Sequence, residues 1–223
     1  MQTSCPELIV MLTHNDVTIK NAFEIFEECK NTNAKYWGFK EIGLSLEEMK
    51  KLCNYMKEND KTTILEVVAY TEEECLKGAQ TALYCQFDIL MGTIYFDSVN
   101  ELCQKNNIKY MPFVGTVNGR PSILTGEIDD IIYEAKKIIN KNVYGFDLLG
   151  YRYNKDAVSL NNKFVSSVNA PVCIAGSINN FERLDEVKKA NPKFFTIGGA
   201  FFENKFGNGI AEQINKVCDY IKK

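Results

Sequence analysis

Three ionisable residues interrupt stretches that are otherwise apolar and are typical of buried strands. Lys40 follows YWGF, Glu66 lies within ILEVVA, and Asp147 lies within YGFDLLGY. A charge in an apolar strand is costly to bury unless it is paired or used in chemistry. A buried carboxylate can remove a proton next to a carbonyl group, and a nearby ammonium can stabilise the resulting enolate. These residue types therefore predict proton transfer at carbon, the chemistry of an epimerase or isomerase.

Two other interpretations of the same residues stay open. Lys40 in its neutral form can attack a carbonyl group and form a Schiff base, as aldolases do. Alternatively, Glu66 and Asp147 are structural partners of Lys40 in a buried ion network, and the protein binds a metabolite without transforming it. A binding protein has no use for charges inside its strands, which favours an enzyme.

Two glycine-bearing turns follow consecutive apolar runs near the end of the chain. The run PVCIA is followed by Gly176 and Ser177, and the run FFTI is followed by Gly198 and Gly199. Because glycine has no Cβ atom, backbone N–H groups at these turns can approach phosphate oxygens directly. The segment FFENKF after Ala200 is expected to add a helical turn whose N-terminus faces the anion. The pair of turns predicts a phosphate site, although glycines also serve tight turns that bind nothing.

Three further polar residues follow predicted strands. His14, the only histidine, lies where a catalytic or ligand-binding group is expected, but a histidine there can equally bond a loop carbonyl. Arg152 is a candidate for binding a carboxylate or phosphate of the substrate. Asp16 is expected to cap the first helix.

The elements that position these residues alternate between strands and helices along the whole chain. The strand-like runs are apolar throughout, which suits a parallel sheet covered on both faces. The predicted strands cover residues 8–16, 36–43, 62–70, 87–95, 109–117, 143–151, 171–178 and 194–202. The predicted helices cover residues 17–30, 45–59, 71–85, 98–107, 127–142, 157–168, 180–191 and 209–223. This layout predicts an α/β chain forming a single (β/α)8 TIM barrel over residues 1–223, with an open doubly wound sheet as the alternative.

A barrel would bring the candidate residues to one face. Active sites of this fold lie at the carboxyl ends of the strands, and a phosphate site often forms after strands 7 and 8. Side chains alternate along a strand, so Glu41 should face the helices if Lys40 faces the interior. The irregular segment 118–126 follows the fifth strand and is predicted to be an active-site loop.

Capping signals support three of the predicted helix starts. Ser45, Thr71 and Ser98 are each followed by a glutamate three residues later. This spacing is typical of a capping box, in which the hydroxyl and the glutamate satisfy free backbone N–H groups.

The composition limits the classes of protein that the chain can be. The 223 residues are 45% hydrophobic and 25% charged, which supports a sizeable core. The formal net charge of −3 provides no basic surface for nucleic acid, and no apolar run approaches the roughly 20 residues that span a bilayer. The start MQTSCPELIVML lacks the features of a signal peptide. The eight cysteines show no spacing typical of zinc ligands, so we expect reduced thiols in a cytoplasmic protein without a metal site or cofactor.

The turns IAGSI and IGGAFF, about twenty residues apart, resemble the paired phosphate-binding turns of the ribulose-phosphate-binding barrel superfamily. This group of TIM barrels includes phosphosugar epimerases, isomerases and aldolases. The resemblance implies a small phosphorylated, sugar-like ligand held by the two glycine turns. The aldolases of the group carry their Schiff-base lysine at the sixth-strand position that is Asp147 here, which weighs against that mechanism. The metal-dependent epimerases use two histidines, whereas this chain has only His14.

The partner expected from these observations is a small phosphorylated metabolite, with neither nucleic acid nor a membrane. A second partner is suggested by the aromatic residues Phe201, Phe202 and Phe206 near the end of the chain. They indicate either the contact of a homodimer or the cover of one end of the barrel.

Overall fold

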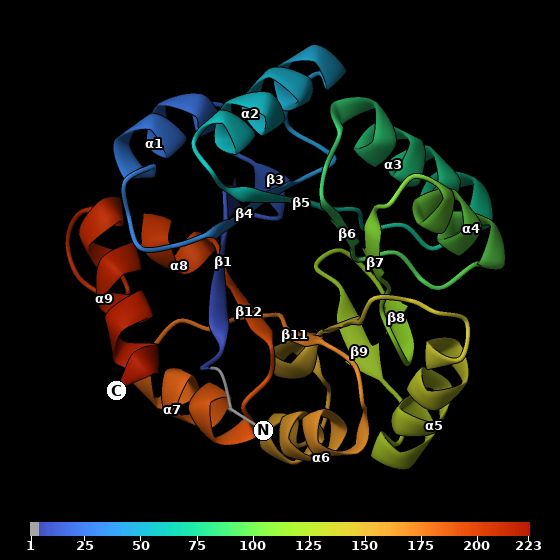
Figure 1. Cartoon of the computed structure of the whole chain (residues 1–223). Coiled ribbons are helices and arrows are strands. Elements are labelled where there is room, and N and C mark those ends of the chain that lie inside the picture. The colour runs from blue at the N-terminus through green and yellow to red at the C-terminus, as the bar shows by residue number, and fades with distance from the viewer. Residues whose placement is uncertain (1–4) are drawn as a thin grey trace.

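A computed structural model describes residues 5–223 and shows a barrel of parallel strands. Figure 1 views the barrel along its axis, with the helices arranged around the strands. The barrel strands are β1 (Glu7–Met11), β4 (Tyr36–Lys40), β5 (Thr62–Glu66), β6 (Ile89–Met91), β7 (Lys109–Met111), β10 (Phe146–Leu148), β11 (Val172–Ile174) and β12 (Phe194–Ile197). Their order is β10-β11-β12-β1-β4-β5-β6-β7, and all adjacent pairs are parallel.

The two end strands of this sheet meet and nearly close the barrel. The backbone N–H of Asp147 donates to the carbonyl oxygen of Pro112 at 3.0 Å, and Phe113 and Asp147 form a parallel bridge. The predicted (β/α)8 barrel is therefore confirmed, and the alternative of an open sheet is wrong.

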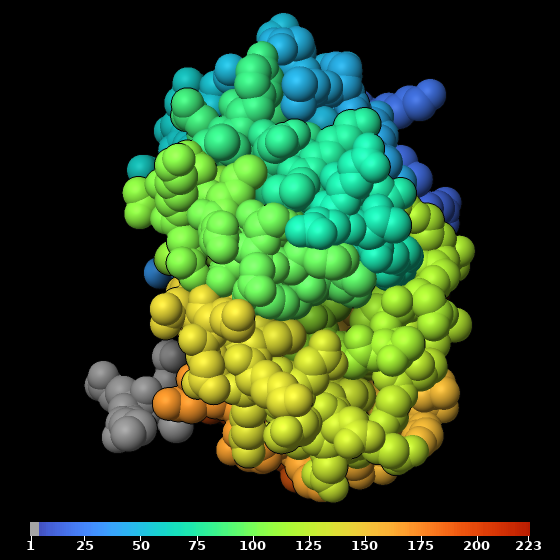
Figure 2. Space-filling model, turned by 90° about the vertical axis from the view of Figure 1, so that its right-hand side faces the viewer, coloured from blue at the N-terminus to red at the C-terminus, as the bar shows by residue number. Residues whose placement is uncertain are grey.

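Helices form an outer layer around the strands (Figure 1), and Figure 2 shows the outer surface of the molecule after a turn of 90°. They are α1 (Ala22–Cys29), α2 (Leu46–Glu58), α3 (Glu72–Cys85), α4 (Asp97–Lys105), α5 (Ile128–Ile139), α6 (Ala157–Ser167), α7 (Phe181–Ala190) and α9 (Ile210–Lys222). Two short helical turns, η1 (Gly150–Arg152) and α8 (Gly199–Phe202), follow β10 and β12 at the carboxyl ends of the strands. The expected helical turn after β12 is thus present, although it begins at Gly199 rather than after Ala200.

The apolar core has two parts because side chains alternate along each strand. In β4, Trp37 and Phe39 belong to the large cluster between strands and helices. The barrel interior is filled by a smaller cluster that consists of Ile9, Met11, Ile64, Ile89, Met91, Met111, Cys173 and Phe194. Gly38 allows close packing there, since a Cβ atom would lie 2.9 Å from both Ile64 O and Met11 Sδ. The alternation places Lys40 inside the barrel, with Gly38.

The segment between β1 and α1 differs from the prediction. Residues 17 and 18 were expected to begin a helix, but β2 (Thr13–His14) and β3 (Val17–Thr18) form an antiparallel hairpin. The helix begins only at Ala22, after Asn21. The prediction that Asp16 caps this helix is therefore wrong, because Asp16 lies in the hairpin turn with a positive φ of 65°.

Two of the three predicted helix caps are confirmed. Ser45 and Glu48 form a complete capping box on α2, and the Thr71 side chain accepts from the Glu74 N–H on α3. The third is wrong, because α4 begins two residues earlier than the Ser98 cap requires, with Phe96 in the N-cap position. The Ser98 hydroxyl instead donates to Glu72 on the neighbouring helix.

The predicted loop 118–126 is more ordered than expected. Most of it belongs to the hairpin of β8 (Thr116–Asn118) and β9 (Ile123–Thr125), and the peptide bond between Arg120 and Pro121 is cis.

The aromatic residues after β12 cover the chain's own core. Phe201 and Phe206 are buried and lie 5.9 Å apart, so they offer no support for a homodimer contact. Phe202 is partly buried and packs 5.9 Å from the ring of His14.

All eight cysteines lie in the described part of the chain as free thiols, and only Cys5 is exposed. Burial raises the pKa of Cys53 to about 11, so this thiol is unreactive at neutral pH. Within residues 5–223, no helix combines the length and apolar character that crossing a bilayer requires.

Candidate functional site

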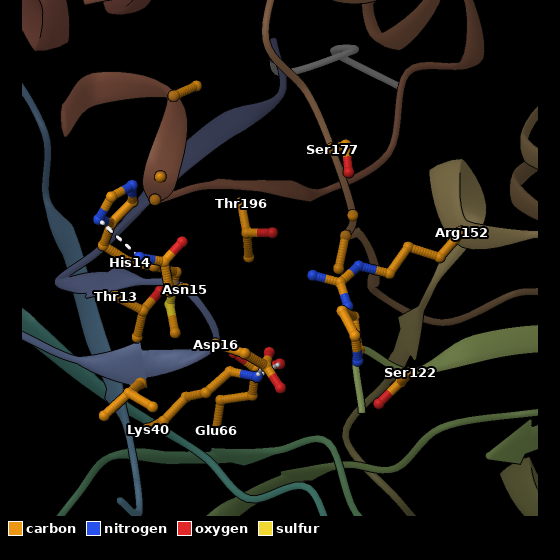
Figure 3. A pocket seen from close by; sticks show the side chains of 18 of the residues that line it. Thr13, His14, Asn15, Asp16, Lys40, Glu66, Ser122, Arg152, Ser177 and Thr196 are labelled. Carbon is orange, nitrogen blue, oxygen red and sulfur yellow. Dashed lines mark hydrogen bonds and ion pairs between the residues drawn. The ribbon is translucent and has the colours of Figure 1, made fainter. Parts of the chain in front are cut away.

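A cavity of about 690 Å³ lies at the carboxyl ends of the barrel strands (Figure 3). Its walls come from the β2–β3 hairpin, from the ends of β4, β5 and β12, from the β8–β9 hairpin, and from the loops that follow β10 and β11. Of the residues predicted to form the site, Lys40, Glu66, His14, Arg152 and all four residues of the glycine turns line it. The exception is Asp147.

Lys40 is the centre of a group of ionised side chains. Its ammonium lies 2.5 Å from Asp16 Oδ1 and 3.6 Å from Glu66 Oε1, and its side chain is only 8% exposed. Burial alone lowers the pKa of Lys40, but the charge of Glu66 and the hydrogen bond to Asp16 outweigh burial and raise this pKa above its ordinary value. Lys40 is therefore an ammonium ion at neutral pH.

Asp147 lies beneath this group rather than in the cavity wall. It pairs in register with Cys173 in the barrel interior, it is 1% exposed, and neither carboxyl oxygen has a hydrogen-bond partner. Burial, reinforced by the charge of Glu66, raises the pKa of Asp147 well above its ordinary value, although Lys40 and Arg152 oppose this. The sequence-based hypothesis placed Asp147 in one cavity with Lys40 and Glu66, but depth in the barrel separates it from the ligand space.

Arg152 extends from η1 into the cavity, as Figure 3 shows. Among residues 5–223, its guanidinium forms no ion pair, whereas Arg120 is bound to Val68 O at 2.6 Å and lies 3.7 Å from Glu41. An unpaired guanidinium at a cavity wall is well suited to bind an anionic group of a ligand.

The two glycine turns lie beside each other, since β11 and β12 are neighbours. Gly176 has a positive φ of 120°, and a Cβ atom there would lie 3.3 Å from Arg152 Cγ. A Cβ atom on Gly198 would lie 2.8 Å from Thr13 Oγ1. By contrast, a Cβ on Gly199 would meet nothing closer than His14 Cδ2 at 3.4 Å. Gly176 and Gly198 are thus required by the fold itself, while Gly199 keeps space open beside the cavity.

His14 lies at the edge of the cavity, close to the second glycine turn. Its Nε2 atom is 3.7 Å from Glu203 Oε1, and its Nδ1 atom is 3.5 Å from Asn15 Nδ2. These contacts hold the ring next to Gly199 rather than next to Lys40.

The β8–β9 hairpin forms a fixed wall of the cavity. The hydroxyl of Tyr70 donates to Gly119 O at 2.8 Å and lies 2.8 Å from Ser122 Oγ. A phenol has one proton, and Tyr70 donates it to Gly119 O. Ser122 must therefore donate its own proton to Tyr70, and only the lone pairs of Ser122 Oγ remain for a ligand.

Sequence reasoning missed several residues of the cavity. Asp16, Ser122 and Thr196 all line it, as does Arg120. Thr196 is the only polar residue in the strand FFTI, so the argument used for Lys40 would also have found it. Glu41, which was expected to face the helices if Lys40 faces the interior, does not line the cavity and accepts a hydrogen bond from Val68 N at 3.2 Å.

Comparisons with known proteins connect this chain to others by structure. No protein-family model and no curated protein sequence matches it. A structure described as native KDPGal aligns over 100% of this chain and 97% of its own, with a TM-score of 0.71 and 10% identity. Orotidine 5'-phosphate decarboxylase from Pyrococcus horikoshii OT3 aligns over 96% and 99%, with a TM-score of 0.69 and 12% identity.

A third structure is N-acetylmannosamine-6-phosphate 2-epimerase from Clostridium perfringens. It aligns over 87% of this chain and 86% of its own, with a TM-score of 0.64 and 14% identity. Similarity at such low identity shows the fold alone. The predicted resemblance to ribulose-phosphate-binding barrels is thus confirmed at the level of the fold.

Proposed function

We propose that this protein is an enzyme that transfers a proton at a carbon atom of a small phosphorylated sugar or keto acid. The observation that carries the proposal is that Lys40 and Glu66 line the same cavity as the glycine turns at Gly176 and Gly198. A phosphate anchored at the turns would leave the rest of a small ligand within reach of the Lys40 ammonium.

In this proposal, one part of the cavity binds the phosphate and the other part carries out the proton transfer. The turns after β11 and β12 present backbone and small side chains to the phosphate, and Arg152 supplies a positive charge for the same group or for a carboxylate. Glu66 is the base that removes a proton next to the carbonyl group, and the Lys40 ammonium stabilises the enolate oxygen. Delivery of a proton from solvent to the other face of the carbon, with the original proton left on Glu66, gives the epimer. Return of a proton to the neighbouring carbon gives the isomer.

The structural neighbours support this class of substrate. Two of them are an orotidine 5'-phosphate decarboxylase and an N-acetylmannosamine-6-phosphate 2-epimerase, both named for phosphorylated compounds. One barrel scaffold hosts many reactions, so the neighbours support the ligand class more strongly than the reaction.

The rival mechanism is a Schiff base on Lys40. Attack on a carbonyl group needs a neutral amine, whereas Glu66 and Asp16 raise the pKa of Lys40. The charged group around Lys40 therefore favours proton transfer over aldol cleavage.

The proposal is tested by incubating the protein with a panel of sugar phosphates and phosphorylated keto acids in heavy water. Proton NMR should show loss of one C–H signal adjacent to the carbonyl of the true substrate. Glu66→Gln should slow this exchange by about 10²- to 10⁴-fold, the usual contribution of a general base. Glu203→Gln, which makes the same change at the edge of the cavity, is the matched control and should retain exchange.

Two outcomes would redirect the proposal. A borohydride-trapped adduct of substrate mass at Lys40 would establish the aldolase mechanism instead. Binding of a phosphorylated compound without exchange or cleavage anywhere in the panel would favour a non-catalytic metabolite-binding barrel.

A further inference from the structure

The β2–β3 hairpin has an unusual turn. Its two turn residues, Asn15 and Asp16, both have positive φ, of 51° and 65°. A two-residue hairpin of this kind usually places glycine in the second position, because a side chain is strained there. A strained residue persists only where its surroundings hold it, and such residues gather at functional sites.

The hairpin holds Lys40 by its side chain. Asp16 Oδ1 lies 2.5 Å from Lys40 Nζ, which is closer than Glu66 Oε1 at 3.6 Å. Asp16 and Lys40 both line the cavity and lie against each other in Figure 3. The strained turn thus delivers a carboxylate to the one ammonium that the proposed reaction uses.

The same hairpin also holds Lys40 by its main chain. The Thr18 hydroxyl accepts from Lys40 N at 2.9 Å and donates to Lys40 O at 2.9 Å. Two residues after Lys40, the carbonyl oxygen of Ile42 accepts from Thr18 N at 3.0 Å. Lys40 is the last residue of β4, and just beyond it Glu41 N still donates to Glu66 O of β5 at 3.2 Å, whereas the N–H and carbonyl groups of Lys40 itself are bonded to Thr18. Both ends of this residue are therefore fixed by one small hairpin.

We propose that the β2–β3 hairpin is a clamp for Lys40, in which Asp16 positions the ammonium and Thr18 fixes the backbone beneath it. The catalytic importance of Lys40 rests on the proposed function, but the clamp itself does not. Asp16 is a positioning residue, because it acts through Lys40. Glycine at position 16 would relieve the backbone strain, but it has no carboxylate to pair with Lys40. The ion pair therefore explains why a strained aspartate occupies this position.

Five charged or titratable groups lie near the ammonium. They are Asp16 from the β2–β3 turn, the adjacent Glu41, Glu66 from β5, Asp147 from β10 and Arg152 from η1. Removal of the Asp16 charge leaves Glu66 as the nearest anion and Arg152 as an opposing cation. The Lys40 ammonium should then lose its proton at lower pH.

The test uses the full chain with ¹³C-labelled lysine Cε atoms, observed by NMR as a function of pH. The Lys40 signal is assigned by its loss in Lys40→Met. In Asp16→Asn, which keeps side-chain size and tolerates positive φ, the pKa of Lys40 should fall by about 1 to 3, as expected when a close counter-charge is lost. With the substrate found by exchange in heavy water, kcat should fall at least tenfold while KM changes little. The alkaline limb of its pH profile should move to lower pH. Asp60→Asn is the matched control, because Asp60 also has a positive φ, of 57°, but is exposed and does not line the cavity.

A second pair of variants tests the main-chain half of the clamp. Thr18→Val removes the hydroxyl but keeps the branched shape, and Thr18→Ser keeps the hydroxyl. Thr18→Val should broaden or shift the Lys40 signal and lower kcat several-fold, whereas Thr18→Ser should restore both. An unchanged Lys40 titration together with unchanged kcat in Asp16→Asn would overturn the clamp. If Lys40→Met retained exchange, the proposed function would fail, and the Lys40 titration would still decide whether the clamp exists.

Discussion

The two sides of the cavity are built in opposite ways. The side formed by the turns after β11 and β12 offers glycine, serine and backbone, with no ionised side chain in the turns themselves. The side formed by β4, β5 and the β2–β3 hairpin offers the Lys40 ammonium with two carboxylates beside it, Asp16 Oδ1 at 2.5 Å and Glu66 Oε1 at 3.6 Å. Under the proposed function, binding and chemistry depend on different elements, and mutations should separate them.

The largest expected effect is on the ionised side. Lys40→Met removes the group proposed to stabilise the enolate, and turnover should fall by about 10²- to 10³-fold, as for loss of one oxyanion-stabilising donor. The affinity for inorganic phosphate, measured by calorimetry, should change little because the turns are untouched. Thermal unfolding of the same variant checks that the carboxylates left behind do not unfold the protein. Undiminished turnover would show that Lys40 takes no part in the reaction.

The opposite separation is expected on the backbone side. Gly199→Ala adds a methyl group whose nearest neighbours would be His14 Cδ2 at 3.4 Å and Glu203 Oε1 at 3.9 Å, so the fold can accept it. The methyl group should obstruct the anion and weaken phosphate binding about tenfold, or about 1.4 kcal/mol. The maximal exchange rate at saturating substrate should be kept. Gly198→Ala is the contrast, because its Cβ would meet Thr13 O at 2.9 Å and should also destabilise the fold. Equal phosphate affinity in Gly199→Ala and wild type would remove this turn from the phosphate site.

The two sides also differ in how far the sequence could predict them. The glycine turns are local motifs at the ends of apolar runs, so the barrel layout alone brought Gly176 and Gly198 to one cavity. Strand alternation predicted that only one of Lys40 and Glu41 faces inward, and the structure shows that it is Lys40. Asp16 was misassigned because its turn is Asn-Asp rather than the familiar Asn-Gly, although the flanking THNDVT is compatible with a two-residue hairpin.

The sequence does not indicate how deep a side chain lies in the barrel or how it is oriented. Asp147 and Glu66 look alike as charges in apolar strands, yet Glu66 lines the cavity and Asp147 is buried below it. The difference depends on the stagger of neighbouring strands in the barrel, which is a property of the whole sheet. The acceptor role of Ser122 likewise follows only from its hydrogen bond with Tyr70, which is distant in the sequence, so the sequence does not indicate it.

A smaller effect is expected on stability beneath the ionised side. The folded protein keeps the proton of Asp147 above the pH at which an unfolded chain releases it, since burial raises this pKa. The folded state then binds more protons than the unfolded state, so this group's contribution to stability falls as pH rises from its ordinary pKa to its folded pKa. Asp147→Asn cannot ionise, and its free energy of unfolding should lack this decline, which amounts to about 1.4 kcal/mol per pH unit. Urea unfolding of both proteins from pH 4 to 8 measures the difference. Parallel pH profiles would mean that Asp147 is already ionised in the folded protein.

The smallest effect is expected at the wall between the two sides. Ser122 offers only lone pairs to the cavity, because its proton is held by Tyr70 and the Tyr70 proton by Gly119 O. A sugar hydroxyl can donate to such an acceptor, whereas a phosphate oxygen cannot. Ser122→Ala should therefore weaken binding of the sugar phosphate found by the exchange experiment by about 1 kcal/mol, the usual net value of one hydrogen bond. Its affinity for inorganic phosphate, which is proposed to bind at the turns, should stay unchanged. Tyr70→Phe sharpens the test: it frees the Ser122 proton, so binding should shift in favour of an analogue whose corresponding hydroxyl is replaced by fluorine or a keto oxygen. If Ser122→Ala weakened inorganic phosphate and the sugar phosphate equally, the wall would belong to the phosphate site and the division of the cavity into two sides would be wrong.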